Sequence, residues 1–314
     1  MQIETLENID TLDLQDTSPL RWYQNPTRHA IVRLLLVIVM VFGTMALSRF
    51  INSKLFGSDH MYLRNAINVI VTLGAYWLYV HLIEKRQATE LTLWRALPEF
   101  GAGILVASGL CVAVVSILSL LGMFHIDGVN YENNQSALYA MLDPLAKFMV
   151  VALMEELFFR AILFRMIEAS LGSIGALLIS ALLFGFAHSY NDGATIYSSL
   201  AIAIEAGFTF GVAYMLTRRL ALCVGMHLAW NFTQGAIFSV AVSGTEGKGW
   251  LKTHMTGSDW LTGGSFGVEA SVVTVLLMTA VGLIFFILAK RKGHFIYGFW
   301  QKQAVPAQRT ADPI

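Results

Sequence analysis

The chain has 314 residues, of which 56% are hydrophobic and only 13% are charged, and its mean hydropathy is +0.60. Soluble domains carry about 25% charged residues, so this composition argues against a soluble globular protein. The 21 basic residues balance 21 acidic ones, which leaves no global positive field, and no nucleic-acid partner is expected. Both cysteines, Cys111 and Cys223, lie in apolar runs, where packing is favoured over a disulfide or a thiolate metal site.

The N-terminal segment, residues 1–28, is acidic and has no early Lys or Arg, unlike a secretory signal peptide. We interpret it as an exposed cytoplasmic tail. Beyond it, apolar runs long enough to cross about 30 Å of hydrocarbon recur along the chain. They cover residues 31–49, 66–83, 101–122, 138–160, 173–190, 196–216, 220–241 and 270–289. Backbone amides in lipid must be paired within their own segment, so these runs predict an all-α, polytopic membrane helical bundle with about eight transmembrane helices.

The predicted spans organise the chain into three parts. We expect residues 29–292 to form one transmembrane domain, with its motif core at 145–240, and residues 293–314 to form a cytoplasmic C-terminal tail. The membrane lipid bilayer is therefore an expected partner.

Orientation follows from Lys and Arg near the helix ends, because these residues resist translocation. With a cytoplasmic N-terminus, the cytoplasmic side receives Arg21, Arg28, Arg33, Lys85, Arg86, Arg95, Arg165, Arg218, Arg219, Lys290, Arg291, Lys292, Lys302 and Arg309. The opposite side receives only Arg49, Lys54, Arg64, Lys248 and Lys252. This excess predicts a multi-pass protein of the cell (plasma) membrane with both termini in the cytoplasm.

The connection 242–269 is the long one between late spans, and it is predicted to lie outside. It contains seven Gly and two Trp, a composition that also permits a flexible or re-entrant segment. An ordinary surface loop is the favoured interpretation.

A few ionisable residues fall inside the apolar spans, where each one costs several kcal/mol unless it is paired or faces an internal cavity. Asp143 and Lys147 are four residues apart, so we expect a structural ion pair with a snorkelling lysine. Glu205 has no partner nearby in the sequence, and its expected role is to line a cavity or to bond a neighbouring helix.

The first informative motif is Glu155-Glu156-x-x-x-Arg160. At 100° per residue, Glu156 and Arg160 share one helix face and are expected to form an ion pair, whereas Glu155 points to an adjacent face. Arg160 then neutralises one glutamate and leaves the other free to act as a general base or acid.

Two further motifs supply imidazole and amide groups. Phe184 precedes His188 by one helical turn and is expected to pack beside it, and His227 and Asn231 project from one stripe of a single helix. A histidine in an apolar helix is more often a packing residue, and a Glu/Arg pair is more often structural. The occurrence of all three pairs on successive spans favours a site.

The lengths of the predicted helices determine whether Glu155, His188 and His227 can meet. Glu155 and His188 are equidistant from the turn predicted at 171–172, so an antiparallel hairpin places both about 25 Å from it. His227 lies only about 12 Å beyond the turn at 218–219. We therefore expect the first hairpin to project about 13 Å further into the cytoplasm, which places the site in the cytoplasmic half of the bilayer.

Two kinds of chemistry fit this set of residues. A carboxylate and an imidazole on neighbouring helices polarise a water, while a second histidine and an amide stabilise an oxyanion. Alternatively, Glu155, His188 and His227 bind a zinc ion that keeps an open position for water. The zincin motif His-Glu-x-x-His is absent and an amide is a poor zinc ligand, so chemistry that requires no cofactor is favoured, with zinc as the alternative.

At these motifs, over about 145–240, the chain resembles the CPBP family of intramembrane proteases. This family includes the Rce1-type CAAX prenyl endopeptidases and bacteriocin-processing or immunity (Abi-type) proteins. The resemblance implies that Glu155 activates water with His188, that Glu156 and Arg160 support the site, and that His227 and Asn231 stabilise the oxyanion. The family has been described both as metalloproteases and as glutamate-dependent proteases, so the metal stays open.

We therefore expect a membrane-embedded hydrolase, an intramembrane endopeptidase that cleaves a peptide or membrane-anchored protein near the cytoplasmic membrane face. The alternatives are a non-catalytic immunity or scaffold protein, and a transporter that uses its buried carboxylates as a proton relay.

Overall fold

The structure is a computed structural model that describes residues 30–56, 60–131 and 134–298 of the chain. The predicted tail 1–28 and residues 299–314 of the predicted C-terminal tail lie outside the described residues. Six helical runs in the described part are long and apolar enough to cross a membrane. They are Val32–Phe56, Met61–Glu84, Ala96–Leu120, Met141–Tyr190, Ile196–Thr217 and Val272–Arg291.

All eight predicted spans are helical. The run Met141–Tyr190 has 50 residues and contains two of them, separated by a kink. The span predicted at 220–241 is a shorter helix, α9 (Ala221–Asn231), extended by the π-helical turn Phe232–Ile237. The prediction of a polytopic helical membrane protein is therefore confirmed.

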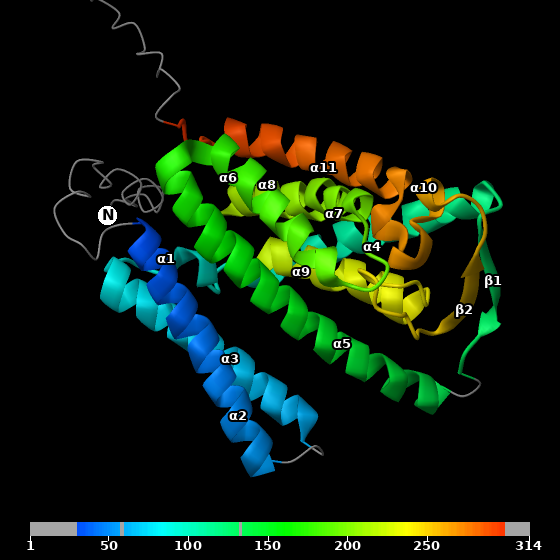
Figure 1. Ribbon diagram of the computed structural model, residues 1–314, viewed down its shortest axis with the longest axis horizontal. Coiled ribbons are helices and arrows are strands. Elements are labelled where there is room, and N and C mark those ends of the chain that lie inside the picture. The colour runs from blue at the N-terminus through cyan, green and yellow to red at the C-terminus, as the bar shows by residue number, and fades with distance from the viewer. Residues whose placement is uncertain (1–29, 57–59, 132–133, 299–314) are drawn as a thin grey trace, which may run out of the picture.

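The N-terminal hairpin lies at one edge of the bundle (Figure 1). Its first arm is α1 (Ala30–Ile38), the π-helical turn Val39–Gly43 and α2 (Thr44–Phe56). Its second arm is α3 (Met61–Tyr79) with the π-helical turn Val80–Glu84. Buried Ser48 and Asn52 donate hydrogen bonds of 2.7 and 3.0 Å to Oδ1 of Asn68. Such polar pairs join helices in a setting where lipid offers no hydrogen-bond partner.

A second hairpin carries most of the motif residues. Its first arm is α5 (Asn134–Glu156) and the π-helical turn Leu157–Phe164, and its second is α6 (Arg165–Ala187), which leads into the 3₁₀ helix His188–Tyr190. The chain reverses inside α6 at Gly172, whose φ of 72° and ψ of 175° are not helical. Glycine adopts positive φ without the steric cost that a side chain adds. The turn predicted at this point is confirmed.

The C-terminal end of the described chain packs on this turn. The backbone N–H of Ser173 donates to the carbonyl of Ile296 at 2.8 Å, and the N–H of Ile296 donates back to Ser173 Oγ at 2.9 Å. Arg218 pairs with Glu168 and also donates to the carbonyl of His294. We call residues 294–298 the C-terminal strap.

Three further spans enclose the site. They are α4 (Ala96–Leu120), the run of α7 (Ile196–Ile202), the π-helical turn Ala203–Phe208 and α8 (Thr209–Thr217), and α11 (Val272–Arg291). α9 lies along α4, and their backbones approach closely at Gly103. A Cβ added to Gly103 would lie only 2.8 Å from the amide nitrogen of Met226. Small residues permit this approach between membrane helices.

The connections at one end of the bundle form a small sheet that the sequence analysis did not predict. β1 (Phe124–Val129) pairs antiparallel with β2 (Leu251–Met255), with His125 opposite His254. Figure 1 shows this sheet at the opposite end from the turn at Gly172. The two strands belong to connections that were predicted to lie on the same side of the membrane.

The connection 242–269 is more than the surface loop that was favoured. After β2 it contains α10 (Asp259–Thr262) and the 3₁₀ turns Gly264–Phe266 and Val268–Ala270. Phe266, Val268 and Glu269 are buried, with exposures of 2%, 0% and 3%. The surface-loop interpretation was wrong because apolar side chains between the glycines draw the segment back into the bundle.

The described spans present apolar side chains outward and polar ones inward. Large exposed hydrophobic residues include Leu105, Leu120 and Leu276, whereas Glu156, Arg160 and Glu205 are buried. This distribution is expected of helices surrounded by lipid and built around an internal polar site.

Candidate active site

A buried charge cluster is centred on Glu156, the last residue of α5. Its Oε2 lies 3.0 Å from Arg160 Nε, and both side chains are fully buried. The Arg160 guanidinium lies 4.9 Å from the centre of the Phe184 ring and donates to the carbonyl of Ala206 at 3.2 Å. The ion pair predicted from the four-residue spacing is confirmed.

Glu156 has a second partner that sequence spacing did not indicate. His227 Nδ1 lies 2.9 Å from Glu156 Oε1, although 71 positions separate the two residues. A carboxylate paired with Arg160 accepts but does not donate, so Nδ1 of His227 carries the proton. Glu156 thus orients the imidazole ring of His227.

Glu155 lies between two imidazole rings. Its Oε2 is 3.9 Å from Nε2 of His188 and 3.9 Å from Nε2 of His227, and its side chain is 30% exposed. Three motifs that are distant in the sequence therefore meet at one carboxylate. Glu155 is also separate from the Glu156–Arg160 pair, as the helical geometry predicted.

His188 is held in a defined tautomer. Its Nδ1 lies 2.8 Å from the carbonyl oxygen of Phe184, which only accepts hydrogen bonds, so Nδ1 is the donor. The rings of His188 and Phe184 are 5.0 Å apart, which confirms the expected packing. Nε2 of His188 therefore faces Glu155 and is free to accept a proton.

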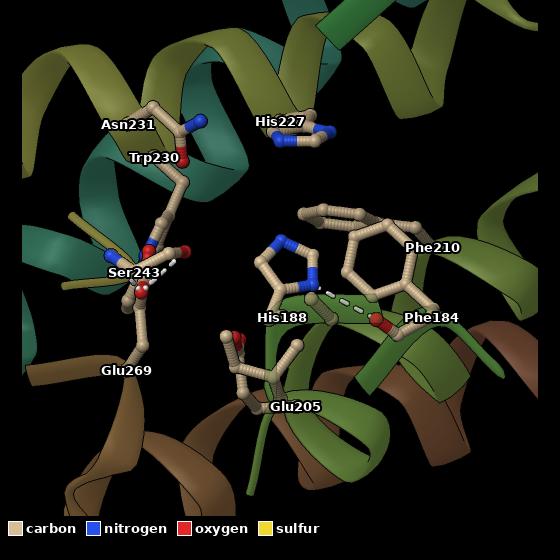
Figure 2. A pocket seen from close by; sticks show the side chains of 11 residues that line it. Phe184, His188, Glu205, Phe210, His227, Trp230, Asn231, Ser243 and Glu269 are labelled. Carbon is tan, nitrogen blue, oxygen red and sulfur yellow. Dashed lines mark hydrogen bonds between the residues drawn. The ribbon is translucent and has the colours of Figure 1, made fainter. Parts of the chain in front are cut away.

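His188 and His227 border a cavity of about 20 Å³, which is room for about one water molecule. It is lined by Phe184, His188, Ile202, Glu205, Ala206, Phe210, His227, Trp230, Asn231, Ser243 and Glu269. Figure 2 shows His227 and Asn231 on α9 at one side, with His188, Glu205 and Glu269 facing them from other elements. The two histidine motifs therefore share the cavity lining with residues that were not predicted from the sequence, and Glu155 lies next to both histidines.

Asn231 is 7% exposed and lines this cavity one helical turn beyond His227. Its neighbour Trp230 is 2% exposed, and its indole Nε1 has no hydrogen-bond partner among the described residues. α9 therefore brings an amide and an indole donor to the same wall.

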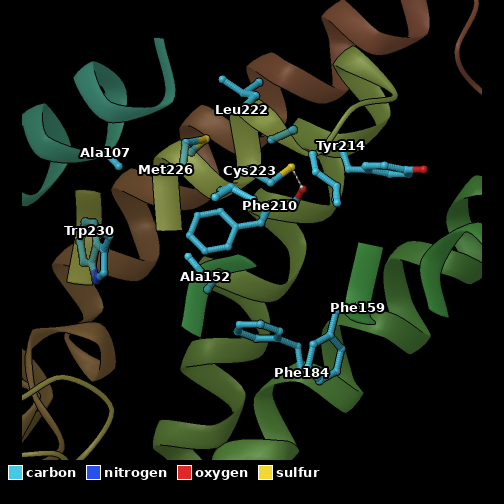
Figure 3. Close-up of a cluster of buried hydrophobic side chains, with 14 of the residues drawn as sticks. Ala107, Ala152, Phe159, Phe184, Phe210, Tyr214, Leu222, Cys223, Met226 and Trp230 are labelled. Atoms are coloured by element: carbon cyan, nitrogen blue, oxygen red, sulfur yellow. Dashed lines mark hydrogen bonds between the residues drawn. The ribbon is translucent and has the colours of Figure 1, made fainter. Parts of the chain in front are cut away.

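Apolar side chains pack against the polar groups, and Figure 3 shows the buried cluster to which Phe159, Phe184 and Phe210 belong. Phe210 stacks on His227 at 5.3 Å, and Phe159 packs edge-on against Phe184 at 4.9 Å. Cys111 and Cys223 are both free and fully buried, as expected of packing residues. An apolar environment has a low dielectric constant, which strengthens the electrostatic interactions between the groups inside it.

Sequence reasoning missed two groups of this site, Glu269 and Ser243. Glu269 Oε2 accepts hydrogen bonds from the backbone N–H and the Oγ of Ser243, at 2.6 and 2.8 Å. The sequence did contain one signal for Glu269, since this carboxylate directly precedes the last apolar run and lies in the glycine-rich segment 263–270. Glu205, whose role was left open, lines the cavity.

Zinc stays the alternative to chemistry without a cofactor. Among the described His, Cys, Asp and Glu side chains, no group of three is arranged to hold a metal ion. The three side chains named for that alternative lie together, with Nε2 of His188 and Nε2 of His227 each 3.9 Å from Glu155 Oε2.

Residues from the end of the bundle that carries the β1–β2 sheet contribute to the cavity. Ser243 and Glu269 come from the connection 242–269, and His188 follows the end of α6. The turns at Gly172 and Arg218 belong to the opposite end. Glu155 meets both His188 and His227, as the comparison of helix lengths required. The expected place of the site in the cytoplasmic half of the bilayer stays a prediction.

Fold and site together define a polytopic helical membrane protein with a buried carboxylate–histidine centre. Residues 137–233 match the family described as type II CAAX prenyl endopeptidase Rce1-like, and this part of the chain is a domain of that family. The match covers just under a third of the chain and includes all six motif residues, but Ser243 and Glu269 lie beyond it. Neither the curated proteins nor the solved structures gave a significant match.

Proposed function

We propose that the protein is an intramembrane endopeptidase that hydrolyses a peptide bond in a peptide or membrane-anchored protein. The observation that carries the proposal is the position of Glu155 Oε2, 3.9 Å from Nε2 of both His188 and His227. This separation is too long for a direct hydrogen bond and matches two groups that bind one water between them. The family match to 137–233 supports the same reaction class.

Glu155 and His188 are the groups proposed to activate that water. Glu155 takes the proton as a general base, and His188 orients the water through Nε2, since its Nδ1 is held by Phe184. The Glu155 side chain is 30% exposed, but its Oε2 is buried and has no hydrogen-bond partner among the described residues, whereas the whole Glu156 side chain is enclosed.

His227 and Asn231 are proposed to stabilise the oxyanion that forms on the carbonyl. The carboxylate of Glu156 on Nδ1 stabilises an imidazolium at position 227, as a carboxylate does for the histidine of a catalytic triad. Nε2–H of His227 and the amide of Asn231 then donate toward the developing charge. Arg160 holds Glu156 in place and is a positioning residue.

Glu155→Gln tests this function, because it keeps the volume and removes the base. Purified protein in detergent is given a panel of quenched fluorogenic peptides that includes leader-like and lipid-modified C-terminal sequences. We expect cleavage of at least one peptide, and a loss of about 10²–10⁴-fold in the variant. Glu246→Gln, at an 80% exposed carboxylate, is the matched control and retains full turnover.

The outcomes separate the rival interpretations. Equal peptide turnover by Glu155→Gln and the parent protein contradicts the protease. Liposome ion flux that depends on Glu155, without cleavage, identifies a transporter, and a correctly folded protein without either activity indicates a scaffold.

The reaction is also proposed to need no metal. We expect 1,10-phenanthroline to leave turnover unchanged and elemental analysis of the active protein to find no stoichiometric zinc. A loss that added zinc restores would overturn this part alone and leave the protease assignment in place.

A further inference from the structure

A second carboxyl pair faces the cavity from the side opposite α9. Glu205 projects from the π-helical turn Ala203–Phe208, and Glu269 from the 3₁₀ turn before α11. The two residues are 2% and 3% exposed and line the same cavity as His188 and His227. The proposed water chemistry uses neither of them.

The two carboxyl groups differ in their hydrogen bonding. Glu269 Oε2 accepts hydrogen bonds from the backbone N–H and the hydroxyl of Ser243. Glu205 Oε2, in contrast, is buried and has no hydrogen-bond partner among the described residues. A buried carboxylate without a partner is strongly unfavourable, and such a group keeps its proton instead. Glu205 is therefore a neutral acid with an O–H group to donate.

The charges around Glu269 also favour a proton on this side of the cavity. Burial raises the pKa of Glu269 to about 7, against the lowering effects of the Ser243 hydrogen bonds and of His227, while Glu155 raises it further. Near neutral pH, Glu269 is therefore able to take up a proton and to give it back.

Backbone packing fixes Glu205 relative to His188. A Cβ added to Gly207 would lie 2.8 Å from the Cα and the carbonyl oxygen of Ala181, so the π-helical turn rests directly on α6. α6 ends at His188, which lines the cavity together with Glu205. The acid and the imidazole are thus carried by two elements whose backbones are in direct contact.

We propose that Glu205 is the general acid of the reaction, donating its proton to the nitrogen that leaves when the peptide bond breaks, and that Glu269 relays the replacement proton. The inference rests on the proposed peptidase function. It assigns the acid to a group other than the base Glu155, because Glu205 already holds a proton when Glu155 must be ionised.

The protons balance over one turnover. Glu155 takes a proton from water as the hydroxyl oxygen bonds to the carbonyl carbon. The tetrahedral species then expels the amine, which takes its proton from Glu205, and the new carboxylic acid is released. The proton on Glu155 finally passes through the cavity to Glu205 by way of Glu269, which restores both groups.

Leaving-group dependence tests this role. An amine must be protonated as it leaves, whereas an activated ester such as a p-nitrophenyl ester releases a stable anion. We expect Glu205→Gln, which matches the neutral acid in shape, to lower kcat on an amide substrate by about 100-fold or more and kcat on the matched ester by less than about threefold. Equal losses on both substrates, or an unchanged amide rate, overturn the proposal.

Two further measurements keep the test decisive. Glu155→Gln is expected to impair ester and amide hydrolysis alike, so its failure to do so counts against the proposed function rather than against Glu205. If Glu205→Gln does not fold, the parent protein suffices. Its amide kcat is then expected to fall at high pH along a limb that is missing from ester hydrolysis, and coincident profiles contradict the role.

Discussion

Replacing Arg160 with Met removes the cation of the buried cluster and keeps an unbranched side chain. Arg160 and Glu156 are both fully buried, 3.0 Å apart. Breaking a buried pair from one side costs about 3–5 kcal/mol, and losing the cation over Phe184 adds about 1–2 kcal/mol. Glu156 keeps the hydrogen bond from His227, so we expect a net loss of about 4 kcal/mol in the free energy of unfolding.

The double variant Glu156→Gln/Arg160→Met separates charge from packing. It leaves no unpaired carboxylate, so we expect it to be more stable than Arg160→Met by about 2 kcal/mol. The assay is unfolding in mixed dodecyl maltoside and SDS micelles, followed by the fluorescence of the 7 tryptophans.

Arg219→Met is the matched control for this series. Its ion pair with Glu99 is partly exposed, with side-chain exposures of 27% and 15%, so the expected loss is about 1 kcal/mol or less. The reasoning is refuted if Arg160→Met costs no more than Arg219→Met, or if the double variant is the least stable of the series.

Three further predictions concern the cavity, the hairpin turn and the orientation. Because burial raises the pKa of Glu269 from 4.5 to about 7, its contribution to stability is fully present below pH 4.5. It is lost, by on the order of 3 kcal/mol, as the pH rises to 7. The free energy of unfolding of Glu269→Gln should therefore decline less with pH than that of the parent protein, and parallel curves for the two proteins contradict this. Gly172→Ala should lower the free energy of unfolding by about 1–3 kcal/mol, because φ is positive there and the new Cβ would lie 2.7 Å from Gly298 Cα. The control Gly74→Ala places its Cβ in open space and should cause no loss. With the basic turns in the cytoplasm, a membrane-impermeant maleimide should label Lys248→Cys on intact cells and Lys292→Cys only after permeabilisation. The reverse labelling pattern contradicts the predicted orientation.

Local geometry explains which parts of the site were predictable from sequence. Glu156 and Arg160 meet because a four-residue spacing places two side chains on one helix face, whatever the rest of the fold does. The turn at Gly172 followed from the interruption of the helical pattern. The approach of His188 to Glu155 followed from equal arm lengths about that turn.

Contacts set by tertiary packing could not be predicted in this way. The bond from His227 to Glu156 depends on how α9 lies against α5. Glu269 reaches the cavity because its connection folds inward. The expected pair of Asp143 with Lys147 was wrong, since Tyr62 from α3 donates its hydroxyl to Asp143.

The small sheet was missed for a related reason. β1 and β2 are short and lie in polar connections that are far apart in the sequence, so neither carries enough alternation to stand out. Their pairing becomes apparent only when both connections are placed at one end of the bundle.

The C-terminal strap has a consequence for biosynthesis. The turn at Gly172 is locked by residues that the ribosome adds more than 120 positions later, and Glu269 enters the cavity only once the segment before the last span has been made. Glu155, Glu156 and His188 are therefore inserted into the membrane long before their surroundings are complete. Under the proposed function, a nascent chain therefore gains its complete centre only when its final helix has been made.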